Sequence, residues 1–212
     1  MTGFAAVVLA GGAARRMGGV DKPDVPVGGV AMRDRVLAAV AGADPRVVVG
    51  PLADPPPGVL AVREEPPGAG PVAATAAGLA ALPAPAAFAE PTGLVAEPAS
   101  LVALLAGDLP LLTADAVDRL TRTVRAGGVD GALYVDTTGR RQLLCGVWRT
   151  DRLRAAVARL AAQRDGGLVG ASMRALLGSL SVAEVTWPGV GAAPWFDCDT
   201  DQDVRQAREW VR

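Results

Sequence analysis

The 212-residue sequence contains no histidine, asparagine or isoleucine, and Lys22 is its single lysine. Without imidazole, the chain cannot use Ser-His-Asp or Cys-His catalysis, a histidine general base, or a zinc site that requires histidine. Its chemistry must therefore depend on Asp, Glu, Arg, Lys, hydroxyl groups and backbone amides, with a hard metal ion if any metal takes part.

Cysteine and aromatic residues are also scarce. Cys145 and Cys198 are far apart and form no C-x-x-C pattern, so we predict two reduced, buried thiols. Aromatic residues make up 4% of the chain, so the core must consist mainly of Ala, Val and Leu. Core or interface packing is the expected role of Trp187, Trp195 and Trp210, in preference to stacking on a ligand.

The chain has little net charge and no long basic run. Its formal charge is −1, and arginines occur at most in short pairs, so we expect no nucleic-acid partner. The N-terminal apolar run FAAVVLA is too short to span a membrane and lacks the basic leader of a secretory signal. We therefore expect a cytoplasmic protein that has no membrane partner.

Apolar strand patterns alternate with helical patterns along the chain. This alternation predicts a single α/β domain over 1–212, Rossmann-like, with a mainly parallel twisted sheet and helices on both faces. The continuous apolar run LVALLAG (101–107) fits a strand buried on both faces, whereas the less regular later strands leave room for an antiparallel one. Residues 83–100, rich in Pro and Ala, are expected to form an inserted surface loop. The predicted strands are 4–10, 46–50, 59–62, 101–107, 131–135, 143–148 and 180–187, and the predicted helices are about 32–41, 70–82, 114–126, 150–163, 168–177 and 200–211.

A glycine-rich segment, LAGGAARRMGGVDK (9–22), follows the first predicted strand. Ligands bind at the carboxyl ends of parallel strands, where Gly11 and Gly12 would let the backbone approach a phosphate closely. Arg16 and Lys22, together with Arg15, are placed to neutralise a polyphosphate.

This loop matches neither of the two best-known phosphate loops. A dinucleotide fingerprint needs G-x-G-x-x-G and an acidic residue after the next strand, where this chain has Gly50; a P-loop lysine would directly follow its glycine, but Val20 and Asp21 intervene. A polar surface turn is the alternative interpretation. Retention of one lysine among arginines favours phosphate binding, because a guanidinium fork does not replace a compact ammonium.

Carboxylates gather after two later segments. Asp108 follows the most apolar strand and is five residues from Thr113, too far to cap the helix that begins there, so we favour a role as a Mg²⁺ ligand. Asp197, Asp199, Asp201 and Asp203 lie before or within the start of the last helix. There, metal ligation competes evenly with helix capping and with stabilisation of the helix dipole.

The pair Arg140 and Arg141 precedes a predicted strand. We favour two solvated arginines at a hairpin on the sheet edge over a contact with an acceptor. Glu64 and Glu65 are equally ambiguous, since either could accept hydrogen bonds from a guanine edge or lie in an exposed turn.

Residues 9–23, LAGGAARRMGGVDKP, resemble the signature loop of the molybdenum cofactor guanylyltransferase (MobA-like) family of nucleotidyltransferases, whose pattern is close to LAGG-x-[SA]-x-RMGG-x-DK. Weaker similarities lie in EEPPGAGPVAA (64–74), AGDLPLLT (106–113) and FDCDTDQD (196–203). The resemblance implies a fold of the nucleotide-diphospho-sugar transferase type. It also implies Mg²⁺-dependent transfer of GMP from GTP to molybdopterin-bound molybdenum cofactor, with a molybdoenzyme or an insertion chaperone as a further partner.

The resemblance implies roles for individual residues. Catalysis would depend on Arg16, Lys22 and Asp108, and Mg²⁺ would bind Asp108 and Asp199, with Asp197 as the alternative second ligand. The triphosphate would contact the backbone amides of residues 10–12. The full set of implied nucleotide contacts is Leu9, Ala10, Gly11, Gly12, Arg16, Lys22, Gly50, Glu65 and Asp108.

This sequence departs from the family pattern at two places. Gly50 stands where the family often has Asn, and Asp197 and Asp199 replace asparagines. LAGG in place of LAAG favours GTP over CTP. A cytidylyltransferase, an enzyme with another phosphate acceptor, and a catalytically silent binding protein remain alternatives, whereas the failed fingerprint argues against an oxidoreductase.

Overall fold

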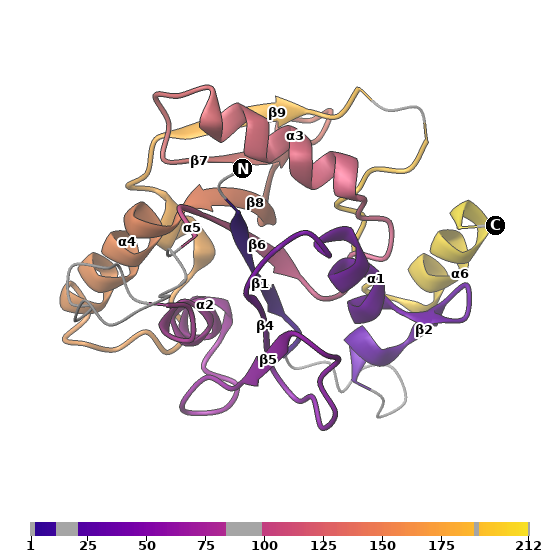
Figure 1. Cartoon of the computed structure of the whole chain (residues 1–212), viewed down its shortest axis with the longest axis horizontal. Helices are drawn as coiled ribbons and strands as arrows, with labels where there is room; N and C mark the ends of the chain where they lie inside the picture. Colours follow the sequence, from indigo (N-terminus) through magenta and orange to yellow (C-terminus); the bar gives the residue numbers. More distant parts are fainter. Residues whose placement is uncertain (1–2, 12–20, 84–98, 189–190, 212) are drawn as a thin grey trace, which may run out of the picture.

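The computed structural model describes residues 3–11, 21–83, 99–188 and 191–211, and its centre is a seven-stranded sheet (Figure 1). The strand order is β5-β4-β1-β6-β8-β7-β9. Within this sheet β8 alone runs antiparallel to its neighbours, which confirms the predicted α/β fold with a mainly parallel sheet. The strands are β1 (Phe4–Leu9), β4 (Arg46–Val49), β5 (Val59–Val62), β6 (Leu101–Ala106), β7 (Gly131–Val135), β8 (Arg141–Arg149) and β9 (Val182–Thr186).

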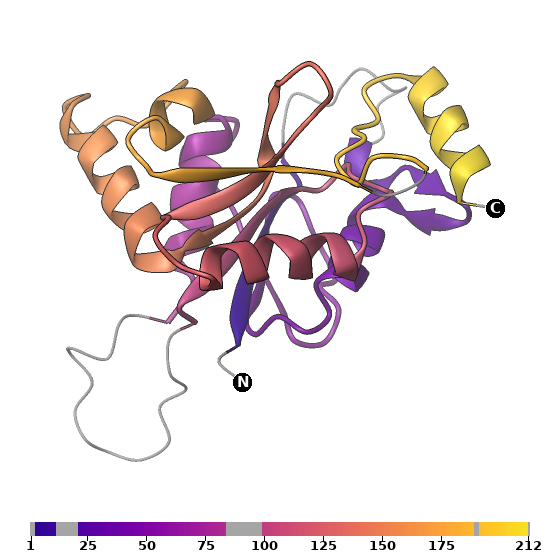
Figure 2. The same cartoon turned by 90° about the horizontal axis from the view of Figure 1, so that it is seen from above.

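Helices cover both faces of the sheet (Figure 2). Helices α1 (Met32–Ala39) and α3 (Ala114–Arg125) pack on one face. The other face carries α2 (Pro71–Ala80), α4 (Thr150–Ala162) and α5 (Met173–Leu177). Alternate residues of β1 enter opposite clusters, Ala6 and Val8 on the first face and Ala5 and Val7 on the second. Burial of both faces explains why the strand is apolar at every position.

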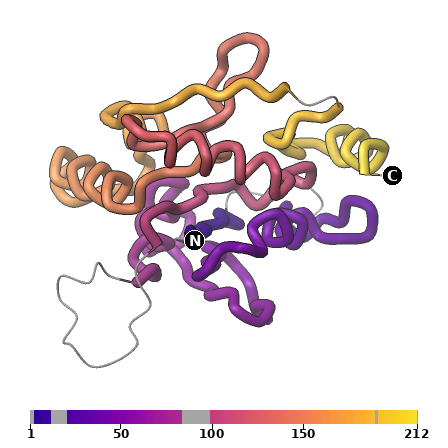
Figure 3. Tube along the Cα trace, turned by 45° about the horizontal axis from the view of Figure 1, so that its top comes forward, coloured from indigo at the N-terminus to yellow at the C-terminus, as the bar shows by residue number. Residues whose placement is uncertain are grey.

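A smaller third cluster lies beside the sheet. It joins the short hairpin of β2 (Pro26–Val27) and β3 (Val30–Ala31) to the last helix, α6 (Asp201–Trp210), which lies next to the hairpin (Figure 3). Its buried side chains are Val27, Met32, Cys198, Val204 and Ala207. The one-turn 3-10 helix η1 (Lys22–Asp24) precedes the hairpin. These three elements were not predicted, because segments of two or three residues carry no measurable periodicity.

Two sequence predictions are corrected by the fold. The helix expected over 168–177 spans only Met173–Leu177; Gly170, with φ +68°, precedes its N-cap Ser172, and glycine disfavours a helix interior. Arg140 and Arg141 are exposed, as predicted, but their hairpin is not at a sheet edge, because β8 lies between β6 and β7. Most of the predicted loop at 83–100, residues 84–98, lies outside the described residues.

Trp187 and Trp195 pack against the core as predicted, whereas Trp210 is 46% exposed. Tyr134 is buried and donates its hydroxyl to Ala116 O at 2.8 Å. The rings of Trp187 and Trp195 lie 5.8 Å and 5.0 Å from that of Tyr134, in the α3 face of the core. Trp210 packs edge-to-face on Phe196.

Both cysteines are free and buried, which confirms that prediction. Burial raises the pKa of Cys145 and of Cys198 to about 12, so both thiols stay neutral and unreactive near neutral pH. No helix in the described part of the chain has the length and apolar character needed to cross a membrane.

Candidate active site

The carboxyl ends of β1 and β6 form the floor of the candidate site. The two strands are parallel neighbours, with Leu9 opposite Ala106, and the backbone N–H of Gly107 donates to Leu9 O at 2.8 Å. This places Asp108 directly beyond the sheet, beside the start of the glycine-rich loop. Thr113 caps α3 by accepting from Ala116 N, so the carboxylate of Asp108 is not needed as a helix cap.

Gly50 lets β4 and β1 come together at this edge. Its φ is +143°, and a Cβ added to it would lie 2.6 Å from the nitrogen of Gly11 and 2.7 Å from the carbonyl carbon of Ala10. Such distances are far inside van der Waals contact. An asparagine with this backbone would therefore clash with Ala10 and Gly11, at the start of the glycine-rich loop.

Part of the loop backbone is already hydrogen-bonded within the protein. Leu9 and Ala10 are buried, and the N–H of Ala10 already donates to Val49 O at 2.8 Å, so the amide of Ala10 is not available to a ligand. Gly12 and Arg16 lie outside the described residues, and their roles stay predictions.

Of the two adjacent glutamates, Glu64 is the one beside the loop. It is 7% exposed, its Oε1 accepts the N–H of Gly68 at 3.0 Å, and that oxygen lies 3.8 Å from a Cβ built on Gly11. Glu65 is exposed. Two consecutive acidic residues give no sequence signal for which one turns inward, so the turn geometry alone makes this distinction.

Lys22 joins two carboxylates that are distant in sequence. Its Nζ donates to Asp108 Oδ2 at 2.5 Å and to Asp199 Oδ1 at 2.6 Å, and its side chain is only 14% exposed. Burial by itself lowers the pKa of Lys22, but the hydrogen bonds and charges of the two carboxylates outweigh it and raise that pKa above its usual value. The lone lysine is therefore a charged, partly buried group held at the ends of the parallel strands.

The competition between capping and ligation before α6 has a clear structural outcome. Thr200 is the N-cap, and its side chain and that of Asp203 form a reciprocal capping box. Asp199 is consequently left for Lys22, whose hydrogen bond holds the pKa of Asp199 below its usual range; the charge of Arg140 makes a smaller contribution. Loss of solvent, followed by the negative charge of Asp199, raises the pKa of Asp197.

Cys198 fixes the position of these aspartates, a role that its sequence context did not reveal. Its side chain is fully buried in the third cluster, with Val27 and Val204 among its neighbours in that core. Its backbone N–H donates to Asp108 O at 3.3 Å. Cys198 thus anchors Asp197 and Asp199 on either side of it to the loop after β6.

The described residues fit a Mg²⁺ ion that completes its ligand sphere from a substrate. Within the described ranges no group of three or more His, Cys, Asp or Glu side chains converges as a metal site. Asp108 and Asp199, however, direct one oxygen each at a single cation, the Lys22 ammonium. Mg²⁺ is commonly held by one or two carboxylates together with substrate phosphates, and this pair would fit such an ion if a polyphosphate supplied the remaining ligands.

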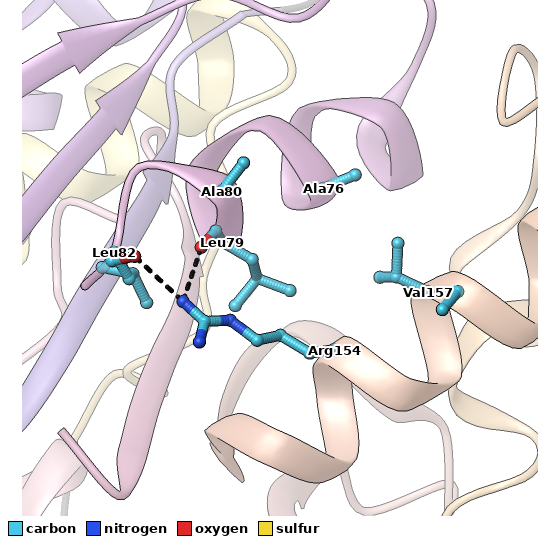
Figure 4. Close-up of a pocket in the computed structure, with 7 residues that line it drawn as sticks. Ala76, Leu79, Ala80, Leu82, Arg154 and Val157 are labelled. Carbon is cyan, nitrogen blue, oxygen red and sulfur yellow. Dashed lines mark hydrogen bonds between the residues drawn. The ribbon is translucent and has the colours of Figure 1, made fainter. Parts of the chain in front are cut away.

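A separate cavity of about 410 Å³ lies between α2 and α4 (Figure 4). It is lined mainly by alanine, leucine and valine side chains and by Arg154, whose guanidinium donates to the carbonyls of Leu79 and Leu82 at 3.0 Å. Among the described residues, no acidic side chain lines this cavity, and none of its lining residues belongs to the Lys22 site. We therefore place the candidate active site at the strand ends.

Comparisons with known proteins find relatives in sequence and in fold. A curated molybdenum cofactor guanylyltransferase from Bradyrhizobium sp. (strain ORS 278) is 32% identical over 216 residues, which cover 97% of this chain and 92% of the relative. The crystal structure of molybdopterin-guanine dinucleotide biosynthesis protein A from Archaeoglobus fulgidus has a similar fold, with a TM-score of 0.66, 16% identity and 97% coverage of both chains.

Cytidylyltransferases have the same fold. The 2-C-methyl-D-erythritol 4-phosphate cytidylyltransferase from Thermus thermophilus matches with a TM-score of 0.65, 21% identity and 97% coverage of both chains. The profile of the MobA-like NTP transferase domain matches residues 6–183, a range that includes Lys22 and Asp108 but ends before Asp199. By this match and by its likeness to the Bradyrhizobium protein, the chain belongs to the MobA-like NTP transferase family of nucleotidyltransferases.

Proposed function

We propose that this nucleotidyltransferase transfers GMP from GTP to the terminal phosphate of molybdopterin-bound molybdenum cofactor, with release of pyrophosphate and a requirement for Mg²⁺. The observation that carries the proposal is the convergence of Lys22, Asp108 and Asp199 beside the glycine-rich loop. The likeness to a curated guanylyltransferase over nearly the whole chain supports the choice of substrates.

The reaction suits a site without histidine. The acceptor is already an anionic phosphate, whose oxygen forms a bond to the α-phosphorus of GTP while the bond from that phosphorus to the bridging oxygen breaks. The electron pair leaves with pyrophosphate, so no general base is needed. The protein has to position the two phosphates and neutralise their charge.

Each element of the site has a proposed role. Lys22 would donate to an oxygen of the leaving pyrophosphate, with Arg16 as the predicted second cation. Asp108 and Asp199, which meet at Lys22, would hold Mg²⁺. When bound there, Mg²⁺ neutralises charge on the triphosphate. The lack of a side chain at Gly50 lets this residue approach Ala10 and Gly11, where the nucleotide-binding loop begins.

Two further residues are proposed to contact the substrates. Glu64, in place of the exposed Glu65, would accept hydrogen bonds from the N1–H and amino group of guanine, because it lies beside Gly11. Arg140 would attract the acceptor phosphate, since its charge already acts on Asp199.

The test is release of pyrophosphate from GTP, Mg²⁺ and molybdopterin-bound cofactor by wild type, Lys22→Arg and Lys22→Met. We expect turnover by wild type and a loss of about 10² to 10³ in rate for Lys22→Met. Lys22→Arg tests whether the compact ammonium itself is required. Arg122→Lys, an exposed change on α3, serves as the matched control and should retain full activity. If wild type released no pyrophosphate, the proposed function would be refuted. If all variants released it at equal rates, Lys22 would have no role in the reaction.

A cytidylyltransferase is the second candidate, because solved cytidylyltransferases share the fold. Calorimetry with GTP and CTP in Mg²⁺ distinguishes the two. Binding of CTP tenfold tighter than GTP would replace guanine with cytosine in the proposal. Nucleotide binding without pyrophosphate release would instead support a silent binding protein. A cytoplasmic location and a molybdoenzyme or insertion chaperone as partner remain predictions.

A further inference from the structure

The Lys22 ammonium contacts the same two carboxylates that are proposed to hold the metal. Asp108 Oδ2 and Asp199 Oδ1 both lie within 2.6 Å of Nζ, and the Asp108 side chain is only 20% exposed. Two neighbouring carboxylates repel each other unless a cation lies between them. In the protein without nucleotide, Lys22 supplies that cation.

A divalent ion and the ammonium have to compete for this position. A metal ion that binds Asp108 Oδ2 and Asp199 Oδ1 must displace Nζ from both oxygens. Even an ion that bound the second oxygen of each carboxylate would lie close to the positive charge of Lys22, which solvent screens weakly because that side chain is only 14% exposed. In either case the lysine weakens metal binding.

A nucleoside triphosphate removes this competition. Its phosphate oxygens offer the ammonium new acceptors, and an ammonium with three N–H donors on a flexible stem can turn to them. The same phosphates add ligands to a pair of carboxylates that cannot form a complete Mg²⁺ site by themselves.

We propose that Lys22 is the resident counter-ion of the metal site, so that nucleotide-free protein binds divalent metal weakly and the metal enters together with the triphosphate. The identity of the two carboxylates as metal ligands rests on the proposed function. The new element is that Lys22 acts against metal binding before the nucleotide arrives, besides its role at the phosphates.

The test measures metal binding without nucleotide. Mn²⁺ is titrated into wild type, Lys22→Met and Arg122→Met, and the free ion is followed by its electron paramagnetic resonance signal. Loss of Lys22 should tighten Mn²⁺ binding by about tenfold or more, because a unit charge in direct contact with the ligands is removed. Arg122→Met changes net charge equally at an exposed position on α3 and should bind as wild type does.

A second set of variants locates the bound ion. Addition of Asp199→Asn to Lys22→Met should abolish the gain, because it removes one of the two ligands. Lys22→Gln, which replaces the ammonium with a polar, uncharged amide on a side chain one atom shorter, provides the same comparison if Lys22→Met does not fold. Equal Mn²⁺ affinity of wild type and the folded Lys22 variant would overturn the inference, as would a gain that persists after Asp199→Asn.

The outcome does not depend on the transfer reaction. Because no nucleotide is present, a gain in Mn²⁺ affinity in Lys22→Met would stand even if wild type failed to release pyrophosphate from GTP. Conversely, if wild type released pyrophosphate but Lys22→Met bound Mn²⁺ no more tightly than wild type, the counter-ion role would be refuted and the proposed function would stand.

Discussion

Replacement of Gly50 by alanine should destabilise the protein and impair nucleotide binding together. At φ +143° a Cβ costs about 1–2 kcal/mol in backbone strain. Contacts of 2.6 Å and 2.7 Å with the backbone of Gly11 and Ala10 add about 1–3 kcal/mol, as for overpacking elsewhere. Since these contacts are with backbone, relief requires the glycine-rich loop to move. We expect a loss of about 2–5 kcal/mol in the free energy of unfolding.

The matched control for this change is Gly127→Ala. Gly127 has φ +110° and no atom within 4 Å of an added Cβ, so the variant suffers backbone strain without a clash. Urea unfolding gives the loss of unfolding free energy for each variant. The difference between the two losses isolates the energy of the contacts at Gly50, because both variants gain equally from a less flexible unfolded chain. Calorimetry then measures the affinity of each variant for GTP. Because the loop is displaced only in Gly50→Ala, we expect weaker GTP binding in that variant and not in Gly127→Ala. Equal unfolding free energies and equal GTP affinity in the two variants would refute the reasoning.

Three other predictions concern single groups of the site. Asp108→Asn should lower the rate of pyrophosphate release by about 10² to 10³ in steady-state assays while the fold, followed by circular dichroism, is retained. Thr200→Ala should cost about 1 kcal/mol of unfolding free energy in urea, because it removes the cap of α6. The pKa of Asp199 is lowered in the folded state, so its contribution is present above the unfolded value and lost as pH falls through the folded one. Asp199→Asn should therefore reduce the loss of stability in acid, by less than about 1 kcal/mol because the side chain is 73% exposed. If the unfolding free energy of Asp199→Asn fell with pH just as that of wild type does, the ion pair between Asp199 and Lys22 would be contradicted.

The sequence predicted the sheet well because its strongest signals are continuous and local. The run at 101–107 is apolar at every position, and both faces of β6 are covered. The same logic failed where glycine interrupted the pattern, as before α5, and where elements were too short to show a period, as in η1, β2 and β3. The order of the strands, including the internal position of β8, depends on pairing between distant segments, which periodicity does not encode.

For the site, the sequence by itself identified Lys22, Asp108 and Asp199 as a group, through motif resemblance and the rarity of lysine. Only the tertiary structure decided that one ammonium contacts both carboxylates, because these residues are 86 and 177 positions apart from it and meet through the third cluster of the core. It also decided that Glu64 turns inward while Glu65 does not, and that Gly50 is required by close backbone approach. A sequence specifies which chemical groups are available, whereas the packing of distant segments sets the distances on which their charges act.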